Sequence, residues 1–334
     1  SVKPHTPALL PALTKGNASR LDFARWLVER DNPLSARVEV NRTWQAIFGT
    51  GLVETAEDFG TRAKRPEHLD LLDWLSVDFM EHNWSRKHLI RRIVSSQTYQ
   101  QSSKTTALLL EKDPRNHLLA RGPRFRAEAE VVRDIALSAS GLLHAKIGGA
   151  SFFPPVPQSL LDYNFFKPYY WEAAEAPERH RRSLYMFRKR AMPDPVMSSF
   201  DAPNSDFACA RRVRSNTPLA ALVSLNEPIF VEAAKAMALR IVREGGHGDK
   251  AWIDYGYRLT TGRSVKAAER EELLRFLKGQ RKRLANGWIN MFRLGFQDPE
   301  DIPELPKGVS PQDVAAWTIA SRVLLNLDET LTKN

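Results

Sequence analysis

The residues best suited to bind a ligand are arginines crowded into residues 181–218. This segment carries eight basic residues against three aspartates, a net charge of +5, which is half of the +10 of the whole 334-residue chain. Guanidinium groups bind carboxylate, sulfate and phosphate through paired hydrogen bonds. We therefore expect an anion-binding surface here. Its predicted side chains are Arg188, Arg190, Arg211, Arg212, Arg214 and Asn216.

A structural role for the same arginines is an open alternative. A long segment without regular structure needs ties to stay ordered, because its backbone polar groups must find partners. The arginines could pair with Asp134, with Asp201 or with backbone carbonyl groups. A binding surface would leave the guanidinium groups open to solvent, whereas structural ties would consume them.

Aromatic residues gather just before this segment. Residues 163–171 read YNFFKPYYW and form a loop rich in aromatic side chains. Such a loop can stack against sugar rings or bases, or it can fill the core. For the binding alternative we expect Tyr169, Tyr170 and Trp171 to contact the ligand.

Motifs of the common enzyme classes are missing. Gly49-Thr50-Gly51 lacks the third glycine of a dinucleotide fingerprint, and no Gly-Lys-Ser/Thr sequence forms a phosphate loop. The eight histidines show no paired spacing that would aim two imidazoles at one metal, so we predict no metal site. His82 and His88 flank a helix break and are expected to face solvent or to cap backbone groups. The catalytic residues, if any, stay unassigned.

An enzyme that acts on polysaccharide is an alternative, because the chain offers carboxylates that could work as a pair. Glycosidic chemistry needs two carboxyl groups that face one cleft with different pKa values. Asp58 and Asp201 are such candidates, and the enzyme hypothesis predicts that they approach within about 5 to 10 Å beside aromatic side chains.

The overall charge favours polyanionic partners, such as an anionic polysaccharide or an acidic protein surface. Nucleic acid ranks last among them because no reading motif is present. The one cysteine, Cys209, excludes an internal disulfide and a c-type haem attachment motif, so we expect no cofactor in this chain. No apolar run approaches the roughly 18 residues of a membrane-spanning helix.

The elements that position these residues are predicted to be mainly α-helical, in a compact multi-helix domain. Prolines and glycines break residues 144–217 into a long Pro/Arg-rich irregular segment with room for a short β-hairpin. Residues 183–190 (SLYMFRKR) are apolar enough for one strand, with a short helix as the alternative. Residues 98–123 should be loop with at most a short helix. Helices are expected at 20–30, from Pro33 to Gly49, at 66–82, from Ser85 onward, and at 126–143, 219–225, 228–243, 249–259, 265–284 and 311–331. The expected organisation is a linker at 1–19, helical blocks at 20–143 and 218–334 around the irregular segment 144–217, and one compact unit over 20–334.

Short sequence stretches along the chain resemble one protein family. They include NPLSARV at 32–38, NRTW at 41–44, LLDWL at 71–75, SSQTY at 95–99, FDAP at 200–203, NTPL at 216–219 and LNEP at 225–228. On these residues the chain resembles a carboxy-terminal domain of unknown function in large planctomycete and verrucomicrobial proteins, where it follows a cytochrome-c-like domain. The resemblance implies an extracytoplasmic location, in the periplasm or at the cell surface, and covalent neighbour domains, one of which carries haem. It implies no reaction.

Charge, aromatic loop and resemblance together predict a binding module of an exported multidomain protein. Its ligand would be an anionic polysaccharide or an acidic cell-surface component. The alternatives are a polysaccharide-active enzyme, hydrolytic or redox-assisted, and a scaffold that docks the cytochrome-c-like domain.

Overall fold

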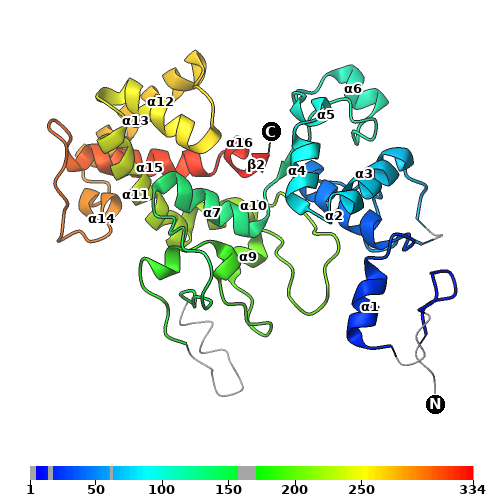
Figure 1. Ribbon diagram of the computed structural model, residues 1–334. Coiled ribbons are helices and arrows are strands. Elements are labelled where there is room, and N and C mark those ends of the chain that lie inside the picture. The colour runs from blue at the N-terminus through cyan, green and yellow to red at the C-terminus, as the bar shows by residue number, and fades with distance from the viewer. Residues whose placement is uncertain (1–4, 14–17, 61–62, 157–170, 334) are drawn as a thin grey trace. The chain divides into compact units, whose positions relative to one another are not determined.

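The computed structural model describes residues 5–13, 18–60, 63–156 and 171–333 (Figure 1). Its contacts divide the chain into two compact units. The first contains residues 1–125 together with Cys209–Arg211, and the second contains Arg126–Ala208 and Arg212–Lys333. The expected organisation into blocks at 20–143, 144–217 and 218–334 stays a prediction. Among the described residues, no helix is both long and apolar enough to cross a membrane.

The first unit is built on α2 (Ser35–Phe48), α3 (Leu69–Glu81) and α4 (Arg86–Val94), which pack around a small core of aliphatic and aromatic side chains. Trp44 and Phe48 stack at 4.1 Å between ring centroids on α2, and Phe79 of α3 meets Trp84 edge to face. Ser19 begins α1 with a capping box, in which its hydroxyl and the Asp22 carboxylate satisfy each other's backbone N–H groups. The other described helices of this unit are α1 (Arg20–Leu27), α5 (Gln97–Gln100) and α6 (Ala107–Lys112).

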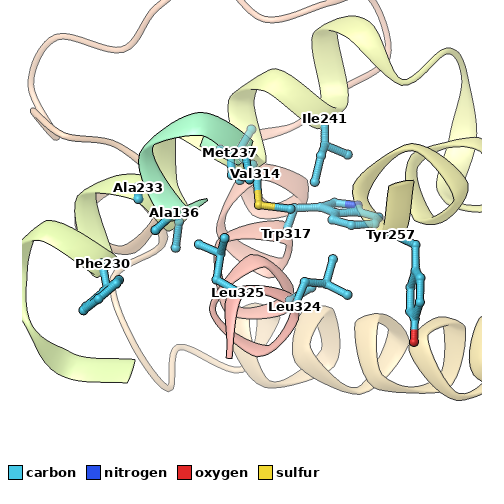
Figure 2. Packing of buried hydrophobic residues seen from close by; sticks show 14 of the residues in the cluster. Ala136, Phe230, Ala233, Met237, Ile241, Tyr257, Val314, Trp317, Leu324 and Leu325 are labelled. Carbon is cyan, nitrogen blue, oxygen red and sulfur yellow. The ribbon is translucent and has the colours of Figure 1, made fainter. Parts of the chain in front are cut away.

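The second unit is organised around α15 (Pro311–Leu325), which is buried on almost every side. Its Trp317 and Val314 are inaccessible to solvent, as are Ala234 and Ala238 of α11 (Pro228–Glu244), and these alanines let the two helix backbones approach. Figure 2 shows side chains of α11 and α15, among them Ile241 and Leu324, gathered in one core. The other α-helices that the structure describes in this unit are α7 (Ala129–Ser140), α9 (Pro195–Ser199), α10 (Pro218–Asn226), α12 (Gly248–Thr261), α13 (Ala267–Ala285), α14 (Met291–Gly295) and α16 (Asp328–Leu331).

The mainly helical fold class is confirmed, and β-structure among the described residues is slight. Strands β1 (Phe125–Arg126) and β2 (Thr332–Lys333) form a two-stranded sheet. Of the two alternatives for residues 183–190, the short helix is right for η2 (Ser183–Tyr185), a single 3-10 turn. Met186 and Lys189 make only isolated bridges, because no neighbouring strand runs alongside them in the described chain.

Several helix boundaries differ from expectation. α1 ends at Leu27 instead of residue 30, and α7 covers Ala129–Ser140 instead of 126–143. The helix expected from Pro66 begins at Leu69, because His68 at its N-cap has non-helical backbone angles. The helix expected over 311–331 ends at Leu325 and restarts as α16, since Leu327 is extended. The Thr330 hydroxyl donates a 2.8 Å hydrogen bond to the Leu324 carbonyl oxygen. This bond replaces the backbone hydrogen bond that a continuous helix would give that oxygen.

Candidate functional site

Buried arginines hold the irregular segment in place. Arg181 is 1% exposed, and its guanidinium group donates to the carbonyl oxygens of Ala150, at 2.8 Å, and Gly148. It also lies 4.1 Å from the ring centroid of Tyr185. Arg133 of α7 donates in turn to the carbonyl oxygen of Arg181 at 2.9 Å. These guanidinium groups therefore supply the hydrogen bonds that a β-ladder would otherwise give this backbone.

Asp201, one of the two expected catalytic carboxylates, is a structural tie. It pairs with the buried Arg126 and accepts hydrogen bonds from the Ser215 backbone N–H at 2.8 Å and the Ser215 hydroxyl at 2.9 Å. Asp58 belongs to the other unit, where its Oδ1 accepts a 2.9 Å hydrogen bond from the Gly60 N–H. Both oxygens of Asp201 are thus engaged with donors, which suits an anchor better than a catalytic base.

Three of the predicted anion-binding arginines meet two glutamates at the start of α7. Arg212 lies 2.7 Å from Glu130 and 3.0 Å from Glu128, Arg188 pairs with Glu130, and Arg214 lies 3.4 Å from Glu128. Glu128 is the N-cap of α7 and Glu130 lies in its first turn, where the helix dipole also favours negative charge. Three guanidinium groups against two carboxylates leave one net positive charge in this cluster.

The ionisation of this cluster follows from its pairing. Burial acts to raise the pKa of Glu130, but the hydrogen bond from Arg212 and the positive charges of Arg212 and Arg188 outweigh it, so the pKa lies below its usual value. Burial lowers the pKa of Arg214 despite the nearby Glu128. Glu130 therefore stays ionised and neutralises part of the positive charge that the sequence concentrates here.

The other predicted anion-binding residues lie elsewhere. Arg190 is 3.3 Å from Asp206, with 71% of its side chain exposed. Arg211 belongs to the first unit, 2.9 Å from Glu57 and 55% exposed, and Asn216 is exposed in the second unit. Each of the five arginines thus has a carboxylate partner, and whether they form a binding surface stays a prediction.

A pocket in the second unit brings an aromatic residue of the predicted site together with one of its arginines. It encloses about 550 Å³, open solvent at its mouth included. Trp171 and Phe187 line it together with Arg188 and Lys189, and Asp194 adds a carboxylate. Prolines, methionines and Val156 make up much of the remaining wall, with Ser198, Asn204 and Ser205 as polar groups. Apolar walls with a few polar groups are typical of ligand sites.

The aromatic wall of this pocket is held in a fixed orientation. The Trp171 indole donates a 2.9 Å hydrogen bond from Nε1 to the Pro154 carbonyl oxygen. Its ring meets Phe187 edge to face at 5.5 Å, and Phe187 contacts Phe153 at 4.7 Å between ring centroids. Tyr169 and Tyr170, predicted to bind with Trp171, lie outside the described residues.

Sequence reasoning missed Phe187, Lys189 and Asp194 as pocket residues. The mixture of aromatic and basic residues in SLYMFRKR is a usable signal, but its apolar pattern predicts only a strand or a short helix and gives no indication of a pocket. Asp194 also has a local role, because its Oδ1 accepts a 2.9 Å hydrogen bond from the Met197 N–H and begins α9.

Comparison with known proteins identifies a family. A search of curated proteins finds no match, and neither does a search of solved structures. A family model described as "PSD1: Protein of unknown function (DUF1553)" matches residues 19–277, a range that includes the pocket and the arginine–glutamate cluster. That match covers well over half of the chain and confirms the resemblance to a domain of unknown function: the chain belongs to the PSD1 (DUF1553) family.

Proposed function

We propose that this chain is a binding module whose pocket holds an anionic saccharide, sulfated or uronic. The observation that carries the proposal is the presence of Trp171, Phe187, Arg188 and Lys189 around one pocket. The hydrophobic face of a sugar ring packs on an aromatic ring, and a sulfate or carboxylate group pairs with a cation beside it. A ligand with both features matches this wall better than a purely apolar ligand or a simple anion.

Arg188 keeps donors for such a ligand although it is ion-paired. Its contact with Glu130 runs through Nη2, and a guanidinium group carries five N–H donors in a planar fork. The ion pair therefore orients the fork without exhausting it. Because Glu128 and Glu130 offset most of the local charge, we expect stacking on the ring of Trp171 to contribute as much to affinity as charge does.

The contacts of Asp194 and Asp201 suit a binding protein better than a hydrolase. Asp201 is engaged by Arg126 and Ser215, and Asp194 begins α9 through the Met197 N–H. A general acid or base needs a carboxyl group that is free to exchange a proton with the substrate. The exported setting and the haem-carrying neighbour domain suggested by the sequence resemblance belong to this proposal as its context.

The test is the affinity of the whole chain for sulfated and uronic oligosaccharides, measured by calorimetry at fixed salt. Trp171→Ala removes the stacking surface and Lys189→Gln removes one charge from the pocket. Each should weaken binding about tenfold, which corresponds to about 1.4 kcal/mol. Arg275→Gln is the matched control for charge, because Arg275 is exposed on α13 and does not line the pocket.

Two results would overturn the proposal. One is an affinity that Trp171→Ala leaves unchanged while circular dichroism shows the helices intact. The other is an equal loss with Arg275→Gln and Lys189→Gln, since that would show attraction to the net charge of the protein instead of to this pocket.

A further inference from the structure

A second cluster of chemically active side chains lies in the first unit, at the junction of α3 and α4. Asp78 and His82 are one helical turn apart on α3 and its C-cap, and His88 lies in the first turn of α4. Ligand atoms of all three residues fall within 4.8 Å of one another. Two histidines and a carboxylate are a donor set that divalent late first-row metals prefer.

The backbone between the helices is shaped so that His88 returns to Asp78. Asn83 and Trp84 both have positive φ angles, 55° and 56°; asparagine tolerates this conformation, but it is costly for a bulky residue such as tryptophan. The Trp84 N–H donates to the Phe79 carbonyl oxygen at 2.9 Å, and the two rings pack edge to face. The Ser85 hydroxyl then begins α4 by accepting from the His88 N–H. Tertiary packing thus stabilises a strained turn, and this turn brings the three side chains together.

The contacts within the cluster converge on the carboxylate of Asp78, whose side chain is 9% exposed. His88 Nε2 lies 2.9 Å from Asp78 Oδ2, and His82 Nδ1 lies 3.4 Å from Asp78 Oδ1. Arg92 Nη2 lies 3.4 Å from the same Oδ1. The expectation that His82 and His88 face solvent or cap backbone groups is met in part, because His82 Nδ1 also lies 2.8 Å from the Asp78 carbonyl oxygen.

We propose that Asp78, His82 and His88 form a binding site for one Zn²⁺ ion, with at least one coordination position left open. His88 would bind through Nε2 and Asp78 through Oδ2, while Oδ1 keeps its contact with Arg92 as an outer-shell partner. His82 completes the set from the exposed side, since 46% of its side chain is accessible. Oxygen-preferring ions such as Mg²⁺ match this donor set poorly.

Binding requires small adjustments that the site permits. Two atoms bound to one zinc ion lie roughly 3 to 4 Å apart. Because the ligand atoms of the cluster lie within 4.8 Å of one another, the widest separation has to close by less than about 2 Å. The two imidazole rings are stacked, with centroids 3.7 Å apart and planes 9° from parallel, so one of them must turn to aim its lone pair at the same ion. His82, at the end of α3 and half-exposed, is the ring with room to do so.

The test is the zinc content of the whole chain, purified without a polyhistidine tag, after equilibrium dialysis against micromolar Zn²⁺ with millimolar Mg²⁺ present. We expect one Zn²⁺ per chain, and an increase in Tm when Zn²⁺ is added. His82→Ala and His88→Gln should each abolish stoichiometric binding, and glutamine at position 88 can still donate a hydrogen bond to Asp78. His247→Ala is the control, because His247 is exposed in the second unit.

Either of two outcomes would overturn the site. One is a chain that retains no stoichiometric zinc. The other is zinc binding that survives in both His82→Ala and His88→Gln while circular dichroism shows the helices intact. Because the cluster and the saccharide pocket belong to different units, zinc binding tests neither the saccharide ligand nor the pocket residues.

Discussion

Arg212 and Glu130 are joined by a 2.7 Å ion pair across 82 residues of sequence. The pair fastens the end of the irregular segment to the first turn of α7. Both side chains are largely buried, with 30% and 16% of their surfaces exposed, so the pair is screened less than a surface salt bridge. Arg188 approaches the same glutamate from another part of the segment, which makes Glu130 a shared anchor.

Replacing this anchor should therefore destabilise the second unit. Glu130→Gln leaves the partly buried Arg188 without its counter-charge and leaves Arg212 with Glu128 as its carboxylate partner. We expect a loss of about 1 to 3 kcal/mol in the free energy of unfolding, because an unpaired buried charge is costly. Urea denaturation followed by circular dichroism measures it. Glu271→Gln on the exposed face of α13 is the control, and equal losses in the two variants would contradict the anchoring role.

Acid stability should depend on Glu269. The hydrogen bond from Arg263 lowers the pKa of this glutamate from 4.5 to about 2, against the opposing effect of burial. A pKa that is depressed in the folded state adds stability that is complete above pH 4.5 and is lost as the pH falls towards 2. Solvent screening reduces the effect, so we expect about 1 to 2 kcal/mol.

The comparison of wild type with Glu269→Gln isolates this contribution from the other carboxylates that titrate in the same range. Urea unfolding at a series of pH values should show the variant less stable at pH 6, with the difference shrinking below pH 4.5. A difference that is constant from pH 6 to pH 2.5 would show that the Arg263–Glu269 pair does not carry it.

Sequence patterns were sufficient to locate the long helices but not the short helices α9 and α14 or the site, for a physical reason. Helices α11 and α12 have local determinants: Pro228 at the first helical position of α11 and the left-handed Gly262 that ends α12. The arginine ties depend on partners that only the tertiary fold brings close. The sequence offered Asp134 and Asp201 as partners for residues 181–214, and Arg182 does lie 3.7 Å from Asp134, but Asp201 pairs with Arg126.

The missed histidine cluster has the same origin. Asp78 and His82 show the four-residue spacing of one helix face, which is readable. His88 reaches them only because Asn83 and Trp84 adopt positive φ angles, which asparagine tolerates but tryptophan disfavours. The packing of Trp84 on Phe79 stabilises that turn, and no local sequence pattern predicts this contact.

Close packing in the core of the second unit gives a prediction about Gly256 of α12. A methyl group at this position would lie 2.9 Å from Cδ1 of Ile241, too close for carbon atoms, and 3.3 Å from Cδ1 of Leu324. Ile241 is fully buried and appears in the core of Figure 2. We expect Gly256→Ala to destabilise by about 1 to 3 kcal/mol although alanine favours helix, because overpacking outweighs propensity.

Ile241→Val removes the clashing carbon atom and should rescue that variant. Alone it should cost about 0.5 to 1.5 kcal/mol. The loss in the free energy of unfolding of the double variant should be smaller than the sum of the two single losses by about 1 kcal/mol. A double-mutant cycle in urea measures this difference. Strict additivity would mean that the core relaxes around the methyl group in another way.

Arg181 and Arg182 are adjacent in sequence and opposite in environment, which makes them a matched pair. Arg181 is 1% exposed and donates to the carbonyl oxygens of Gly148 and Ala150, whereas 56% of the Arg182 side chain is exposed. Lysine keeps the charge but replaces the planar fork with a single ammonium group. Arg181→Lys should therefore lower the free energy of unfolding by about 2 to 4 kcal/mol, and Arg182→Lys by less than about 0.5 kcal/mol.

Limited proteolysis measures the same difference locally. The backbone near residues 146–150 should become more sensitive to cleavage in Arg181→Lys than in Arg182→Lys. Equal cleavage in both variants would show that another contact holds that backbone.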